Sequence, residues 1–170
     1  MTKQLAILVE DTYEDLELWY PLLRLREAGY APILVGPKAQ TTYLSKRGLE
    51  AVSDRNAEHM NPGDLAGIII PGGYAPDRMR RFPAMVGLVR GVYDSGGVTA
   101  AICHGGWMLA SANIIRGKKV TGFPSIKDDL INAGALYLDE EVVVDGQLIT
   151  SRRPADLPAF LREILHALSR

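Results

Sequence analysis

Cys103 is the only cysteine of the 170-residue chain, and it stands in the segment AICHGGWMLA. The apolar run VTAAI precedes it, and His104 and two glycines follow it, which predicts a strand that turns sharply into a helix. At such a turn, Gly105 and Gly106 would permit a strained backbone that projects the cysteine above the sheet. The helix amino terminus would favour the thiolate, so we expect the pKa of Cys103 to lie below the ~8.5 of a free thiol. The alternative is a small apolar side chain buried in the core.

His104 is the candidate base for this cysteine, because a sharp turn can bring together two consecutive side chains that a regular helix keeps apart. The other histidines, His59 and His166, do not follow a predicted strand. Glu14 stands where a loop meets a helix, beside the expected site. A carboxyl group next to a thiolate tends to hold its proton, so Glu14 could donate a hydrogen bond to the sulfur or shuttle protons. The plainer alternatives are a solvent-facing imidazole and a carboxylate that complements the helix dipole.

Gly72 and Gly73 follow the run GIII and a proline, which predicts a strand that ends in a tight loop. Backbone N–H groups in such a loop can point at a developing oxyanion. A Pro-Gly-Gly segment alone is weak evidence for an oxyanion-binding loop, and it becomes stronger evidence if the loop lies beside the cysteine. The N–H groups of Gly73 and His104 would then hold the oxyanion.

Apolar runs alternate with helical patterns along the chain. Strands are expected at 5–9, 32–36, 67–70 and 98–102, a hairpin at 141–150 around Asp145-Gly146, an irregular or hairpin segment at 41–56, and helices at 15–28, 83–94, 106–112 and 154–168. This alternation predicts an α/β sandwich around a mostly parallel sheet, in one domain that spans residues 1–170. Because sites form at the carboxyl ends of such strands, the loops at 10–15, 71–77 and 103–106 should meet.

The composition is that of an ordinary globular protein, with 47% hydrophobic and 23% charged residues. A net charge of −1 argues against a nucleic-acid-binding surface. One cysteine cannot form an intramolecular disulfide. The amino-terminal segment lacks the pattern of a signal peptide, and no run approaches the ~20 apolar residues of a membrane span. These observations favour a cytoplasmic protein with neither a membrane nor a sequence-specific nucleic-acid partner.

Several segments taken together resemble the PfpI family of the ThiJ/PfpI superfamily: IIIPGGYAPDRMRR, AAICHGGWMLAS, IKDDLINAGA, EEVVVDGQLITSR and PADLPAF. The resemblance covers essentially the whole chain. It implies a flavodoxin-like three-layer α/β sandwich, assembled as dimers or as a hexameric ring, that works without a metal or other cofactor. It also implies a catalytic Cys103 with His104 beside it, and Glu14 as the carboxyl that contacts the cysteine. In hexameric relatives a glutamate of a neighbouring subunit completes a triad, and the matching residue here is Asp77, one methylene shorter.

The chain departs from the family pattern at two places near the expected site. The family commonly has Cys-His-Gly-Pro-Gln, so Gly106 and Trp107 change the floor or wall of the pocket. A tyrosine that some relatives carry in a Ser-Tyr-Pro segment is Phe123 here, and its phenolic donor is lost.

The resemblance implies an enzyme that hydrolyses peptides, removes glyoxal or methylglyoxal adducts, or hydrates those aldehydes to hydroxy acids. Each reaction begins with attack of a thiolate on a carbonyl carbon. A small domain with a shallow site favours small carbonyl compounds or glycated groups over general proteolysis. The alternative is a non-enzymatic stress chaperone or redox sensor that uses Cys103 as an oxidisable thiol. A class I glutamine amidotransferase would need a later histidine at the site. The only later histidine is His166, which lies inside the expected terminal helix, so this class is rejected.

Overall fold

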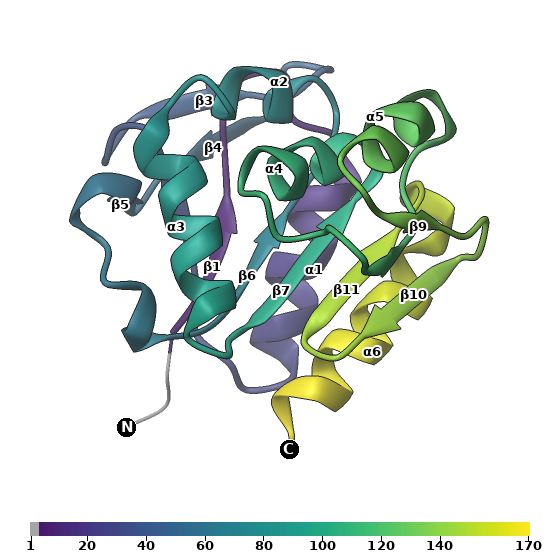
Figure 1. Ribbon diagram of the computed structural model, residues 1–170. Coiled ribbons are helices and arrows are strands. Elements are labelled where there is room, and N and C mark those ends of the chain that lie inside the picture. Colours follow the sequence, from purple (N-terminus) through teal and green to yellow (C-terminus); the bar gives the residue numbers. More distant parts are fainter. Residues whose placement is uncertain (1–3) are drawn as a thin grey trace.

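The computed structural model describes residues 4–170, and the main sheet forms its centre (Figure 1). Its strands are β1 (Gln4–Leu8), β2 (Pro32–Gly36), β5 (Arg55–Asn56), β6 (Leu65–Ile70), β7 (Val98–Ile102), β10 (Val142–Asp145) and β11 (Leu148–Ser151). Within the described residues these seven strands lie in the order β10-β11-β7-β6-β1-β2-β5. β10 runs antiparallel to β11, and the other neighbouring pairs are parallel. The mostly parallel sheet predicted from the sequence is confirmed.

Helices cover both faces of this sheet. On one face α1 (Asp15–Glu27) packs against α6 (Leu157–Leu168), and on the other α3 (Pro83–Asp94) packs against α4 (Gly106–Ser111). In Figure 1, α3 and α4 lie in front of the sheet, and α1 and α6 lie behind it. The result is the expected three-layer α/β sandwich. No helix within residues 4–170 is both long and apolar enough to cross a membrane.

Short elements complete the fold. They are the antiparallel pair β3 (Thr42–Leu44) and β4 (Glu50–Val52), the parallel pair β8 (Lys119–Val120) and β9 (Leu136–Tyr137), the helices α2 (Ala75–Met79) and α5 (Lys127–Asn132), and the 3-10 turns η1 (Ala57–His59), η2 (Pro62–Asp64), η3 (Cys103–Gly105), η4 (Pro124–Ile126) and η5 (Pro154–Asp156). The hairpin alternative for residues 41–56 is therefore confirmed for β3 and β4. The short helices α2 and α5 were not predicted from the sequence, because five or six residues show little of a helical period. α4 is equally short, but the strand and the Cys-His-Gly-Gly turn before it indicated a helix.

Two details differ slightly from the sequence expectations. The β10–β11 hairpin pairs Asp145 with Leu148, so its loop residues are Gly146 and Gln147, one position later than expected. The terminal helix begins as the turn η5, which leads into α6.

The strand order explains where a site can form. From β1 the chain moves to β2 on one side, whereas β6 and β7 lie on the other side of β1. Such a reversal leaves a crevice at the carboxyl ends of the strands. The loops after β1, β6 and β7 therefore meet, as expected. β7 is buried along its whole length, and its apolar residues anchor the strand that leads to Cys103.

Candidate active site

Cys103 occupies a strained turn between β7 and α4. Its backbone has a φ of 60°, in the left-handed region that residues with a side chain rarely adopt. Such a conformation costs about 1–3 kcal/mol and persists only where the surrounding structure enforces it. The turn η3 then leads directly into α4. This strand–turn–helix arrangement is a nucleophile elbow and confirms that part of the fold prediction.

Glycines allow the elbow to pack closely against its neighbours. A Cβ on Gly105 would lie 2.5 Å from the carbonyl oxygen of Ile70 at the end of β6. A Cβ on Gly72 would lie 2.7 Å from the Cβ of Cys103. Gly73 has a φ of 76°, and its Cβ would lie 2.6 Å from the backbone nitrogen of Glu14. The loops after β1, β6 and β7 therefore approach too closely for side chains at these positions.

The carboxyl group beside the thiol belongs to Glu17, which corrects the expectation for Glu14. Glu17 is fully buried, and its Oε2 accepts a hydrogen bond from the Gly72 N–H at 2.7 Å. Its carboxyl group also lies close enough to the Cys103 thiol for each group to shift the pKa of the other. Burial raises the pKa of Glu17 from its ordinary 4.5 to about 8, and the charge of Glu14 raises it further. Glu17 therefore holds its proton near neutral pH and can donate it toward the sulfur.

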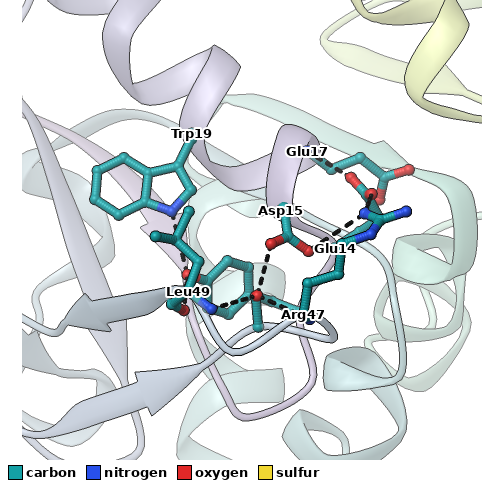
Figure 2. Close-up of polar contacts among 8 residues, drawn as sticks. Glu14, Asp15, Glu17, Trp19, Arg47 and Leu49 are labelled. Carbon is teal, nitrogen blue, oxygen red and sulfur yellow. Dashed lines mark hydrogen bonds and ion pairs between the residues drawn. The ribbon is translucent and has the colours of Figure 1, made fainter.

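Glu14 instead caps the first turn of α1. Its Oε2 accepts a hydrogen bond from the backbone N–H of Glu17 at 3.0 Å, and its Oε1 lies 3.4 Å from Nη1 of Arg47 (Figure 2). A capping side chain must turn back toward the helix end, so it cannot also reach the sulfur. The spacing of Glu17, Pro21 and Leu25 along the buried face of α1 was a signal for the correct carboxyl, which the sequence analysis did not use.

His104 lies against Cys103 as its expected base. The distance from Nδ1 of His104 to Sγ of Cys103 is 3.2 Å. The ring stacks on Phe123, with centroids 4.9 Å apart, and meets the edge of Trp107 at 5.1 Å. Burial, together with the charge of Lys46, lowers the pKa of His104. The imidazole is therefore neutral near pH 7 and can accept a proton.

Ser125 contacts the far side of this imidazole, a contact that the sequence analysis missed. Its Oγ lies 3.1 Å from Nε2 of His104. The two residues are 21 positions apart, and a lone serine after a proline carries no local signal for such a contact.

The expected low pKa of Cys103 is wrong for this structure. Burial raises the pKa of the thiol to about 12, and the charge of Glu17 acts in the same direction. The backbone N–H groups of His104 and Gly73 act in the opposite direction, but they do not outweigh burial. The amino terminus of α4 lowers the pKa of Cys103 little, because α4 has only six residues and a 3-10 turn separates it from β7.

Of the three expected backbone donors, only Gly72 has a different role from the expected one. The N–H groups of Gly73 and His104 lie close enough to the Cys103 sulfur to lower its pKa, so an oxyanion on an attached carbon could reach them. The N–H of Gly72 is already bound to Glu17, so it positions the carboxyl group and is not a free oxyanion donor.

The remaining expected site residues fall into two groups. Trp107 and Phe123 flank His104, whereas Gly106 faces the interior, where a Cβ would lie 3.1 Å from both Ile126 and Leu130. Asp77 is exposed on α2, and among residues 4–170 no hydrogen bond or ion pair links it to His104 of the same chain. The role of Asp77 across a subunit contact stays a prediction. Nowhere in the described part of the chain do three or more His, Cys, Asp or Glu side chains group as a metal site would require.

The fold and the site together define an α/β protein with a cysteine elbow backed by a carboxyl group of the first helix. Residues 3–167 match the DJ-1/PfpI family, and the chain belongs to this family. Its central sheet and covering helices are the flavodoxin-like arrangement found in DJ-1 structures, among them that of DJ-1beta from Drosophila melanogaster, with a TM-score of 0.89 at 28% identity over 99% of this chain and 91% of that chain.

Two relatives with enzyme names match along nearly their whole length. The chain is 41% identical over 170 residues to protein/nucleic acid deglycase 2 of Escherichia coli, covering 99% of each chain. It is 39% identical over 165 residues to a deglycase of Pyrococcus horikoshii, covering 97% of this chain and 99% of the relative. These names support an enzymatic function of the deglycase type.

Replacing Gly105 with alanine should destabilise the protein, because the new Cβ would lie 2.5 Å from the carbonyl oxygen of Ile70. We expect a loss of about 1–3 kcal/mol in the free energy of unfolding, as for other overpacked sites. Gly87→Ala is the matched control: Gly87 is exposed on α3, a Cβ there meets no atom within 4 Å, and alanine favours a helix. Urea unfolding measures both variants. Equal stabilities for Gly105→Ala and the wild type would contradict the close approach of the elbow to β6.

Glu17→Gln should flatten the dependence of stability on pH. The pKa of Glu17 is about 8 in the folded protein against an ordinary 4.5, so the folded state holds a proton that the unfolded state releases. The wild type therefore loses stability as the pH rises from about 5 through about 8. Glutamine has no proton to lose and keeps an oxygen for the Gly72 N–H. As the pH rises across this range, the free energy of unfolding of Glu17→Gln should increase relative to that of the wild type. The difference between the exposed control Glu140→Gln and the wild type should stay constant. Parallel curves for Glu17→Gln and the wild type would refute the raised pKa.

Proposed function

We propose that this protein is a cofactor-independent enzyme in which Cys103 attacks a small carbonyl compound or its adduct, with deglycase or glyoxalase activity that protects against reactive carbonyls. The observation that carries the proposal is the position of the Cys103 thiol, which lies at a strained elbow between the carboxyl group of Glu17 and Nδ1 of His104. Two backbone N–H groups face the same sulfur. The deglycase names of the relatives support the same class of substrate.

The proton positions suggest how the reaction begins. With the pKa values of Cys103 and Glu17 raised and that of His104 lowered, the resting site holds a thiol, a carboxylic acid and a neutral imidazole near pH 7. Nδ1 of His104 takes the thiol proton as the sulfur bonds to the carbonyl carbon. The N–H groups of Gly73 and His104 stabilise the oxyanion that forms.

The later steps depend on the substrate. With an aldehyde such as glyoxal, a proton shift between the two carbons converts the thiohemiacetal into a thioester of a hydroxy acid. Water then hydrolyses the thioester, which releases the hydroxy acid and restores the thiol. Glu17, which is protonated near pH 7 and lies beside the Cys103 thiol, exchanges protons during this shift. With an adduct on an amine, the same attack would release the amine before hydrolysis.

The surroundings of the thiol favour small substrates over peptides. Only 6% of the Cys103 surface is exposed. Tyr74, Trp107 and Phe123 surround His104, with the Tyr74 ring centroid 6.3 Å from that of the imidazole. A small aldehyde or a glycated side chain at the end of a flexible stem reaches such a thiol more readily than an extended peptide does. The raised pKa of Cys103 argues against the redox-sensor alternative, because oxidation by peroxide requires the thiolate.

The proposed enzyme is a homo-oligomer, a dimer or a hexamer, in which Asp77 acts across a subunit contact. Asp77 is exposed on α2, and so are the neighbouring Arg78 and Arg80. Arg78 pairs with Glu10 of its own chain, with Nε and Oε1 3.8 Å apart, which leaves Asp77 available to a neighbour. In a ring assembly its carboxylate would approach His104 of that neighbour.

Cys103→Ala and Cys103→Ser should abolish turnover, because the chain has no other thiol to replace the nucleophile. The loss should reach orders of magnitude in kcat/KM. Release of glycolate from glyoxal, release of amine from a glyoxal adduct, and cleavage of a chromogenic peptide would be measured in parallel, with circular dichroism as the control for folding. The proposal predicts that the wild type turns over glyoxal and the glyoxal adduct, and that neither variant does. A kcat/KM near that of the wild type in either variant would contradict the role of Cys103 as the nucleophile.

A further inference from the structure

His104 is held by polar atoms at both edges of its ring. Nδ1 lies 3.2 Å from Sγ of Cys103, and Nε2 lies 3.1 Å from Oγ of Ser125. The serine comes from the turn η4, which follows Phe123. The backbone N–H of Phe123 donates to the carbonyl oxygen of Cys103 at 3.2 Å, so this segment is fastened to the elbow itself.

The aromatic neighbours fix the plane of the imidazole but not its direction. Phe123 stacks on the ring at an interplanar angle of 25°, and Trp107 meets it at 68°. Trp107 is itself held, because its Nε1–H donates to Oδ2 of Asp129 at 2.8 Å and the guanidinium of Arg80 lies 5.6 Å from its ring centroid. A half-turn of the imidazole about its Cβ–Cγ bond would preserve these ring contacts. It would, however, replace both nitrogens with carbons at the two polar contacts.

We propose that Ser125 is the positioning residue of this site: its Oγ accepts a hydrogen bond from Nε2–H of His104 and thereby keeps a bare Nδ1 directed at the Cys103 sulfur. The inference rests on the proposed function, in which Nδ1 takes the thiol proton. Each neutral imidazole carries its proton on one nitrogen, so a proton fixed on Nε2 leaves the lone pair on Nδ1. When Nδ1 becomes protonated, Nε2 still carries its proton, and the bond to Ser125 persists.

A hydroxyl group suits this place because it brings no charge. The charged groups near the ring are Lys46, which lowers the pKa of His104, Glu17 beyond the sulfur, and Arg80 and Asp129 at Trp107. A carboxylate at Nε2 would raise the pKa of His104 and favour a ring that is already protonated at rest. Ser125 orients the imidazole and leaves it free to accept the thiol proton. Ser125 occupies Nε2 within one chain, so an Asp77 carboxylate that approached His104 from a neighbouring subunit would compete with it for that nitrogen.

The test is NMR of the ring nitrogens in protein labelled with ¹⁵N-histidine, together with steady-state kinetics on glyoxal. In the wild type, the neutral ring of His104 should carry its proton mainly on Nε2. Ser125→Ala should shift the ratio of the two neutral tautomers toward Nδ1–H by about five-fold, the effect of losing one ordinary hydrogen bond. It should lower kcat by a similar factor while KM changes less than about two-fold.

Ser125→Thr should restore both the tautomer ratio and kcat, because it keeps the hydroxyl group and the site is exposed. Ser95→Ala, at an exposed serine before β7 at the opposite end of the sheet, is the matched control and should leave both unchanged. The signals of His59 and His166 serve as internal references.

An unchanged tautomer ratio in Ser125→Ala would overturn the proposal. If Asp77→Ala shifted the ring signals of His104 and Ser125→Ala did not, the positioning residue would be Asp77 of a neighbouring subunit. The NMR readout does not depend on turnover. A wild type that leaves glyoxal untouched would therefore refute the proposed function, and the ring signals would still decide the role of Ser125.

Discussion

The hydrogen bond between the Gly72 N–H and Oε2 of Glu17 holds the site together. It ties the first turn of α1 to the loop after β6, and it leaves the carboxyl group against the sulfur of Cys103. The contact requires a residue without a side chain, because a Cβ on Gly72 would lie 2.5 Å from this oxygen and 3.1 Å from Sγ. A carboxyl group can be buried here only because the loop contributes backbone alone. The other oxygen of Glu17 is buried without a partner among residues 4–170, which adds to the cost of ionising the group.

This burial determines the protonation of the whole site. Burial disfavours the charged form of each group, and a carboxylate beside a thiolate would add the repulsion of two negative charges, so both groups keep their protons near neutral pH. The elbow therefore does not supply a ready thiolate. It supplies a thiol at a strained position, next to a neutral imidazole. In the proposed mechanism this imidazole takes the thiol proton as the sulfur attacks a carbonyl carbon.

The sequence predicted the features that local patterns encode. The run VTAAI before Cys-His-Gly-Gly was enough to predict the elbow, and the alternating apolar and helical segments were enough for the sheet and its layers. Three features depended on tertiary contacts and were not predicted correctly. The choice between Glu14 and Glu17 depends on which side of the first helical turn faces the sheet. The pKa of Cys103 depends on burial by segments distant in sequence, and the contact of Ser125 with His104 spans 21 residues.

A crystal structure of the wild-type protein after brief exposure to glyoxal would test most directly whether Cys103 is the nucleophile. The account predicts a covalent adduct on Sγ of Cys103, with its oxygen within hydrogen-bonding distance of the N–H groups of Gly73 and His104. Glyoxal also reacts with exposed guanidinium groups such as that of Arg47, whose side chain is 70% exposed, and these provide an internal comparison. Adducts on exposed arginines beside an unmodified Cys103 would contradict the account.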